Sequence, residues 1–154
     1  MKIAIGADHG GFLLKEALKP YLVQAGHTVI DVGAPSDEPS DYPDIAAMVA
    51  QKVMRADSDR GIVICGSGVG ACVAANKFPR IRASVCHDTY SAHQGVEHDD
   101  MNVLCLGARI IGEALAKDIV SSFISAKFAA DVERYKRRLD KVLDIERRFS
   151  ADNT

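Results

Sequence analysis

The 154-residue chain contains no tryptophan, and aromatic residues account for only 6% of it. A protein that stacks bases or sugar rings needs an aromatic platform, so the sequence argues against that kind of binding site. Basic residues are not in excess either, because the chain has 19 Lys and Arg residues and 21 Asp and Glu residues. The resulting net charge of −2 lacks the positive excess of a nucleic-acid-binding protein.

Long apolar runs are also absent. No run approaches the ~18 residues that cross a bilayer, and the apolar N-terminal stretch reaches Asp8 and His9 too early for a signal peptide. The cysteines form no C-x-x-C pair and the histidines are not clustered, which excludes a zinc ribbon and a secreted disulfide framework. We therefore expect a cytoplasmic protein that binds neither nucleic acid nor membranes and holds no metal.

Hydrophobic residues make up 47% of the chain, enough for a buried core without disulfides. The length fits one domain, which we place at residues 1–150, followed by a polar tail at residues 151–154. Short apolar runs predict strands at residues 2–7, 28–32, 61–65, 82–86 and 103–107. Apolar spacings of three and four predict helices at residues 12–25, 44–55, 71–77, 89–97, 113–123 and 129–149. Pro20 is expected to kink the first helix or to start a new turn there.

Alternating strands and helices are typical of an α/β fold with a parallel sheet covered on both faces. We predict a single domain built on a Rossmann- or flavodoxin-like, doubly wound, five-stranded parallel sheet, with a long C-terminal helix. Ligands of such sheets bind beyond the carboxyl ends of the strands. The stretches that follow strand ends should therefore line the site: residues 8–11, 65–70, 87–88 and 107–109.

The strongest local signal is the sequence ICGSGVG at residues 64–70, which joins a predicted strand to a predicted helix. Its glycines allow backbone N–H groups to point into one concavity, which suits an anion. The spacing matches neither the P-loop nor the full dinucleotide-binding pattern. The alternative interpretation is a tight turn between strand and helix without a ligand.

Several side chains in the predicted edge could carry chemistry. A thiol at Cys65, beside a helix N-terminus, could act as nucleophile or base, whereas the other three cysteines fit the apolar core. Asp8 and His9 could hold sugar hydroxyls or phosphate, or could merely stabilise a turn. His98, followed by a pair of aspartates, could shuttle protons or could be a solvated loop residue.

The predicted C-terminal helix is rich in Lys and Arg. Arg134 and Arg138 are four residues apart and share a face, so two guanidinium groups could bind one phosphate. A solvated basic face is the alternative. The helix is also long for the core that it could cover, which favours docking on a partner chain.

Taken together, these motifs resemble the ribose-5-phosphate isomerase type B family, which includes allose-6-phosphate isomerase and the galactose-6-phosphate isomerase subunits. The resemblance covers residues 1–148 and rests on motifs that occur in the same order. They are GADHGG at 6–11, DYPD at 41–44, ICGSGVG at 64–70, AANK at 74–77, NVLCLGAR at 102–109 and R-x-x-x-R at 134–138.

The resemblance implies a dimer, in some members paired into tetramers, whose active sites use residues of both chains. It implies interconversion of ribose 5-phosphate and ribulose 5-phosphate through a cis-enediolate, without metal or organic cofactor. Cys65 would move the proton between C2 and C1, Ser67 would move the hydroxyl proton, and His98 would assist opening of the furanose ring. The implied substrate-binding residues are Asp8, His9, Tyr42, Gly66, Gly68, Val69, Gly70, Asp99, Arg109, Arg134 and Arg138.

One position departs from the family pattern. The family usually has asparagine after the histidine, where this chain has Asp99. An asparagine amide can donate a hydrogen bond to the enediolate, whereas an ionised carboxylate only accepts. Two alternatives therefore stay open: isomerisation of a six-carbon sugar phosphate such as allose 6-phosphate, and a non-catalytic module that binds sugar phosphates.

Overall fold

The structure is a computed structural model, and it describes residues 1–150. The predicted tail at residues 151–154 lies outside the described residues. The strands are β1 (Lys2–Ala7), β2 (Thr28–Asp31), β3 (Arg60–Cys65), β4 (Ala83–Val85) and β5 (Val103–Gly107). The helices are α1 (Phe12–Gln24), α2 (Tyr42–Met54), α3 (Val69–Ala75), α4 (Thr89–Asp99), α5 (Glu113–Ser125) and α6 (Glu133–Ser150).

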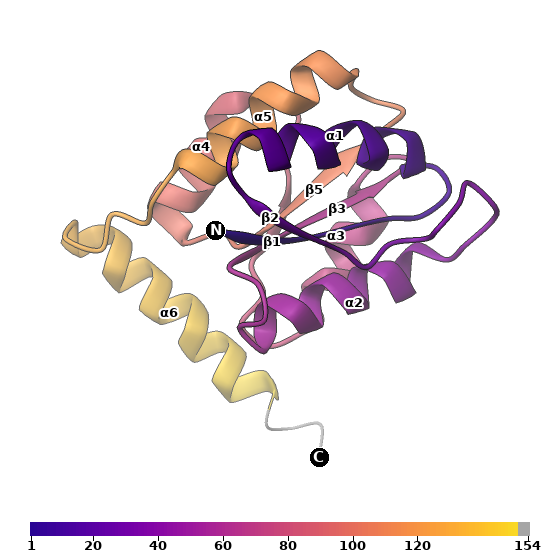
Figure 1. Ribbon diagram of the computed structural model, residues 1–154. Helices are drawn as coiled ribbons and strands as arrows, with labels where there is room; N and C mark the ends of the chain where they lie inside the picture. The colour runs from indigo at the N-terminus through magenta and orange to yellow at the C-terminus, as the bar shows by residue number, and fades with distance from the viewer. Residues whose placement is uncertain (151–154) are drawn as a thin grey trace.

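The five strands form one parallel sheet in the order β2-β1-β3-β5-β4. Helices α1, α4 and α5 cover one face and α2 and α3 cover the other, so the predicted doubly wound α/β fold is confirmed (Figure 1). The chain moves outward from β1 to β2 and then returns to β3 on the other side of β1. The carboxyl ends of β1 and β3 therefore form the switch point at which such sheets bind ligands.

The alternating side chains of the strands build two cores. Ile3 and Ile5 of β1 pack with Leu18 of α1 on one face, while Ala4 packs on the other face with Val49 of α2. Strands β3 and β5 are buried along nearly their whole length, as expected of central strands in a parallel sheet. Both faces thus bury apolar surface and hold the sheet edge rigidly.

Several element boundaries differ from the sequence prediction by a few residues. Helix α2 begins at Tyr42 because Pro43 occupies its first turn, where the missing N–H is tolerated. Helix α6 begins only at Glu133. Pro20 neither ends α1 nor restarts it, since one helix continues to Gln24. Leu18 and Leu22 on either side of the proline are fully buried in the same core, which holds the helix across the lost hydrogen bond.

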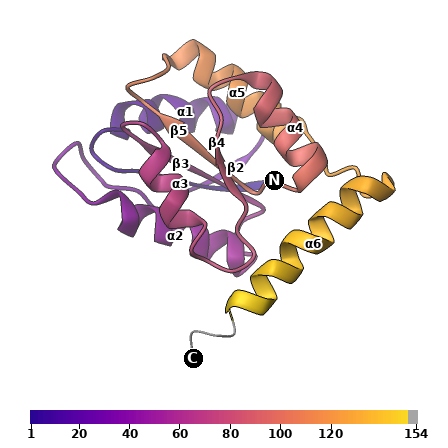
Figure 2. The same cartoon turned by 180° about the vertical axis from the view of Figure 1, so that it is seen from behind.

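Helix α6 stands apart from the sheet and packs mainly against the end of α4 (Figures 1 and 2). Only Tyr135 of this helix is buried. Val142, Ile145 and Phe149 remain exposed by 50%, 52% and 66%. This exposed apolar row is the kind of surface that proteins bury against a partner.

Candidate active site

A cavity of about 320 Å³ opens at the carboxyl edge of the sheet, at the switch point between β1 and β3. It is lined by Asp8, Tyr42, Cys65, Gly66, Ser67, Gly70, Arg109 and Ile110. Strand β1 delivers the aspartate, β3 the cysteine and glycine loop, and β5 the arginine. The structure thus brings together residues from three of the stretches that the strand-end rule selected.

The thiol of Cys65 lies at the bottom of the glycine loop and is only 4% exposed. The backbone N–H of Gly68 donates to its Sγ atom over 3.1 Å. Gly68 has a φ angle of +81°, which favours glycine, and a Cβ there would lie 3.0 Å from the Leu106 carbonyl carbon. The loop therefore wraps around the thiol because glycine allows both the turn and the close approach.

Ser67 lies at the exposed rim of the same loop, and its Oγ accepts a hydrogen bond from the N–H of Val69 over 3.2 Å. The N-cap residue of helix α3, Gly68, has no side chain to cap the helix that begins at Val69, so Ser67 supplies the hydroxyl that accepts from its first N–H group. First-turn N–H groups of a helix have no acceptor within the helix. The rim therefore offers a hydroxyl and backbone donors beside the thiol, an arrangement suited to an oxygen that gains negative charge.

The carboxyl group of Asp8 is buried, with 7% of the residue exposed. Its Oδ1 accepts hydrogen bonds from the N–H groups of Gly10 and Gly11 over 2.9 and 3.2 Å. A Cβ at Gly11 would lie 2.6 Å from the Ile64 carbonyl oxygen, so only glycine fits there. Asp8 thus stabilises the turn while also lining the cavity.

Tyr42 covers the glycine loop from the side of α2. A Cβ at Gly70 would lie 2.6 Å from the tyrosine ring, so the ring rests directly on that glycine. The loop before Tyr42 is tied to β1, because His9 N–H donates to Ser40 Oγ (3.1 Å) and Ser40 N–H donates to His9 Nδ1 (3.2 Å). His9 itself lines a neighbouring cavity with Leu13 and not the cavity of Cys65.

The prediction that residues 87–88 line this site is wrong. Strand β4 lies at the sheet edge, separated from β3 by β5. The Nε2 atom of His87 accepts a hydrogen bond from the N–H of Gly107 (2.9 Å), and the Asp88 carboxylate caps α4 by accepting from Ser91 N–H (2.6 Å). The hydrogen bonds that Ser91 donates to the Asp88 carboxylate lower the pKa of that carboxyl group. Both side chains therefore serve the fold.

The remaining predicted site residues lie at the opposite edge of the sheet. Helix α4 runs back from the carboxyl edge, so His98 and Asp99 come just before the start of β5. The five residues of β5 cover about 16 Å, which separates these two residues from Cys65. Exposed Arg134 and Arg138 lie on α6, which packs against the end of α4. We call His98, Asp99, Arg134 and Arg138 the second group. One chain alone therefore does not bring the second group to the Cys65 cavity.

His98 is held in an ordered position within this second group. Its ring stacks on Tyr135, with centroids 4.0 Å apart and an interplanar angle of 21°. Gln94 Nε2 lies 2.8 Å from His98 Nδ1. The Arg134 guanidinium lies 4.8 Å from the centroid of the Tyr135 ring and donates to the Tyr135 hydroxyl over 3.0 Å. Gln94 and Tyr135 were not among the predicted site residues, although Gln94 is four residues before His98 and Tyr135 directly follows Arg134.

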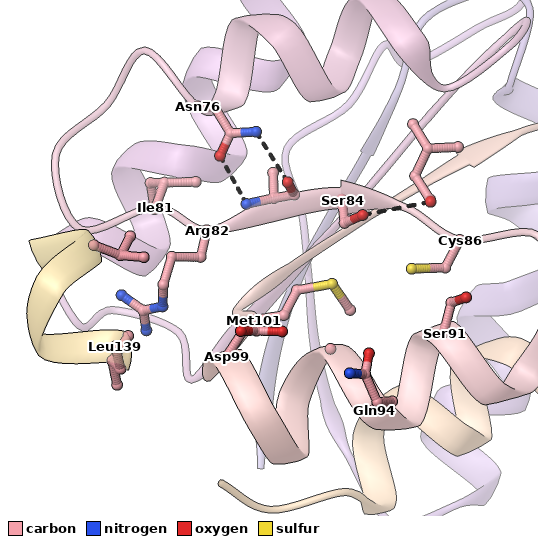
Figure 3. A pocket seen from close by; sticks show the side chains of 14 residues that line it. Asn76, Ile81, Arg82, Ser84, Cys86, Ser91, Gln94, Asp99, Met101 and Leu139 are labelled. Carbon is pink, nitrogen blue, oxygen red and sulfur yellow. Dashed lines mark hydrogen bonds between the residues drawn. The ribbon is translucent and has the colours of Figure 1, made fainter. Parts of the chain in front are cut away.

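Asp99 belongs to a larger cavity of about 560 Å³ between α4, the edge strand β4 and α6 (Figure 3). Ser84 and Arg82 extend from the β4 side, and Gln94 extends from α4. The cavity contains neither Cys65 nor Ser67. Within one chain, the position that departs from the family pattern is therefore remote from the candidate base.

The other three cysteines do not line the cavity of Cys65. A hydrogen bond with the Cys105 thiol lowers the pKa of Cys72 to about 7. The same hydrogen bond, together with burial, raises the pKa of Cys105 well above its ordinary value, and burial raises that of Cys86. All four cysteines are free thiols.

Within residues 1–150, no three His, Cys, Asp or Glu side chains gather closely enough to hold a metal ion. The same described part of the chain contains no helix with the length and apolar character needed to cross a membrane.

Comparison with known proteins agrees with this fold. Residues 3–142 match the Ribose/Galactose Isomerase family model. Ribose-5-phosphate isomerase B of Escherichia coli is 46% identical over 147 residues, covering 96% of this chain and 97% of that protein. D-erythrulose-4-phosphate isomerase of Pectobacterium atrosepticum is 43% identical over 129 residues, covering 83% of this chain and 85% of that protein.

Solved structures show the same fold. Ribose-5-phosphate isomerase B of Clostridium thermocellum superposes with a TM-score of 0.93 at 46% identity, covering 97% of this chain and 99% of that one. The Mycoplasma genitalium enzyme, solved with bound ribulose-5-phosphate, has a TM-score of 0.88 at 38% identity, covering 95% and 96%. The chain therefore belongs to the ribose/galactose isomerase family and is a sugar-phosphate aldose–ketose isomerase.

Proposed function

We propose that this isomerase interconverts ribose 5-phosphate and ribulose 5-phosphate through a cis-enediolate, with Cys65 as the base. The observation that carries the proposal is the thiol of Cys65 at the floor of the switch-point cavity, beside Ser67 and the backbone donors of the glycine loop. The names of the Escherichia coli and Clostridium thermocellum relatives support the choice of substrate.

The proton transfers can be assigned to this chain's own groups. The Cys65 thiolate removes the proton from C2 of the open-chain aldose and returns it to C1, while the hydroxyl proton moves from O2 to O1. The Ser67 hydroxyl carries that second proton. Backbone N–H groups of residues 66–70 stabilise the negative charge on the enediolate, because a weak carbon acid needs both a base and charge stabilisation.

The second group of residues completes the site from another copy of the chain. The length of β5 keeps His98 and Asp99 away from Cys65 of their own chain, and the exposed apolar row of α6 requires a partner. We therefore propose a homodimer, in which Arg134 and Arg138 of one copy bind the phosphate at the Cys65 cavity of the other. Arg109 and His9 lie at the carboxyl edge and add positive charge and donors there.

Opening of the furanose ring must precede proton abstraction. The C1–O4 bond breaks, the C1 hydroxyl loses its proton to become the aldehyde, and O4 gains a proton to become a hydroxyl. His98 assists by hydrogen bonding to O4 while water exchanges the two protons. The stacked, hydrogen-bonded position of its ring supports this role.

A second candidate substrate is a tetrose phosphate. The Pectobacterium relative is named a D-erythrulose-4-phosphate isomerase, and its identity of 43% is close to that of the Escherichia coli relative. The Asp99 carboxylate, where a donor is expected, would also fit a different placement of the substrate. A six-carbon substrate such as allose 6-phosphate remains a third hypothesis.

The test is isomerisation in D₂O, followed by NMR with a chelator present. We expect ribulose 5-phosphate to form from ribose 5-phosphate, with deuterium incorporated at the exchanged carbon. Cys65→Ala should abolish both signals while the protein stays folded, and Cys72→Ala is the matched control that should retain them. Turnover of only the four- or six-carbon phosphate would refute the ribose assignment, and exchange that survives in Cys65→Ala would place the base elsewhere. Binding of sugar phosphates without any exchange would support the non-catalytic hypothesis.

A further inference from the structure

Gln94 lies one helical turn before His98 and reaches its ring directly. Its Nε2 atom is 2.8 Å from His98 Nδ1. An amide NH₂ group donates hydrogen bonds and cannot accept them. With the amide nitrogen as the donor, Nδ1 is the acceptor, and a neutral imidazole that accepts at Nδ1 carries its hydrogen on Nε2.

The surroundings of His98 hold the ring in one plane. Tyr135, which is only 8% exposed, stacks on one face with a centroid separation of 4.0 Å. The Glu97 carboxylate is 3.6 Å from Nε2, on the side away from Gln94, and also lies 3.7 Å from His93. Arg134 donates to the Tyr135 hydroxyl and so links the imidazole to a proposed phosphate-binding side chain.

We propose that Gln94 is a positioning residue that keeps the hydrogen of neutral His98 on Nε2, so that the imidazole presents a donor to the oxygen of the sugar ring. The inference rests on the proposed function, in which His98 assists ring opening. With the hydrogen on Nδ1 instead, Nε2 would present a lone pair to the lone pairs of O4. That arrangement would oppose the charge that develops on O4 as the C1–O4 bond breaks.

Sugar chemistry supplies a discriminating pair of substrates. Ribose 5-phosphate closes its furanose through O4 and must be opened before isomerisation. In erythrose 4-phosphate O4 is esterified, so no furanose can form and no ring has to be opened. A residue that acts only through ring opening should affect the first substrate and spare the second.

The experiment compares kcat/KM of Gln94→Leu with that of the unaltered protein on both substrates, with all measurements at the same pH. We expect kcat/KM for ribose 5-phosphate to fall on the order of ten-fold. This is smaller than the rate factor that a general acid or base itself contributes, because His98 is still present and only its orientation is lost. Turnover of erythrose 4-phosphate should change by less than about two-fold. His93→Leu is the matched control, since His93 is on the same helix and its ring faces the Glu97 carboxylate (3.7 Å) rather than the Nδ1 atom that Gln94 reaches, and it should leave both substrates unaffected.

Nitrogen NMR of the His98 ring reads the tautomer without any activity. We expect a protonated Nε2 in the unaltered protein and averaged nitrogen shifts in Gln94→Leu. A hydrogen on Nδ1 in the unaltered protein would overturn the inference. Equal losses on both substrates would also overturn it, because they would indicate structural damage. If the unaltered protein turns over neither substrate, the proposed function fails instead, and the spectrum still decides the tautomer.

Discussion

Lys15 is the most deeply buried charged side chain of the described residues, and replacing it tests how the site is held. It lies on α1 and is 1% exposed. Its ammonium donates to both carboxylate oxygens of Asp31 (3.0 and 2.8 Å) and to the Ala34 carbonyl (3.0 Å). These bonds fix the start of the loop that leads to Ser40 and Tyr42. Lys15→Met keeps the buried apolar stem and removes the ammonium.

The expected loss of stability follows from those contacts. An orphaned buried carbonyl at Ala34 costs about 1–3 kcal/mol. Breaking a fully buried ion pair costs about 3–5 kcal/mol, but Asp31 is 27% exposed and keeps its bonds to Lys19 and to the N–H of Gly33. We therefore expect a total loss of about 3 kcal/mol. For a chain of this size that lowers Tm by roughly 6–12 °C, measured at constant protein concentration.

The pH dependence gives a second check. Burial raises the pKa of Asp31, but the hydrogen bonds from Lys15, Lys19 and Gly33 outweigh it, and the net pKa is lowered. The ion pair therefore contributes stability above the ordinary carboxyl range near about pH 4 and loses it as the pH falls. The Tm difference between Lys15→Met and the unaltered protein should shrink between pH 7 and pH 3.

Lys19→Met is the matched control for this experiment. Lys19 also bonds Asp31 but is 30% exposed and touches no loop carbonyl, so its loss should cost less than about 1 kcal/mol. Activity should fall in Lys15→Met, through the displaced loop that carries Tyr42, and not in Lys19→Met. The reasoning would be refuted if Lys15→Met and Lys19→Met lowered Tm equally. It would also be refuted if the loss of Tm in Lys15→Met were the same at pH 3 as at pH 7.

Three further predictions concern the site itself. Arg138→Ala should raise KM by about ten-fold or more with little change in kcat, because phosphate binding is shared by ground and transition states; a fall in kcat at constant KM would contradict this. Gly70→Ala should lower both kcat/KM and Tm, since the new Cβ would lie 2.6 Å from the Tyr42 ring, at a cost of about 1–3 kcal/mol. Normal activity and Tm in that variant would show that the ring moves freely. Asp99→Asn should raise the turnover of ribose 5-phosphate or leave it unchanged, and a large loss would show that the carboxylate has a positive role.

Local patterns were enough to predict much of the fold. Strand β1 and the glycine loop after β3 are encoded by short apolar runs followed at once by Gly and polar residues, and both appear where expected. The rule that ligands bind at strand ends predicts Asp8, Cys65 and Arg109 at one edge of the sheet, and all three line the same cavity there. Such predictions succeed because the signals and the structures they specify lie within a few residues of one another.

The order of the strands could not be read in the same way. The sequence order placed residues 87–88 at the site, but β5 inserts between β3 and β4 and leaves those residues to cap and brace the sheet. Burial of Lys15 was equally unforeseen, because its partner Asp31 lies in a different element. Pairings between distant segments depend on the whole packed structure and leave no local signature.

The sequence by itself determined the α/β class, the glycine loop and the candidate base, since each depends on local spacing of apolar residues and glycines. Only the tertiary structure decided that His98, Asp99, Arg134 and Arg138 lie at the sheet edge opposite Cys65. The physical reason is the antiparallel run of α4 against the sheet, which returns the chain to the amino ends of the strands. That separation is what makes a second copy of the chain necessary to the proposed active site.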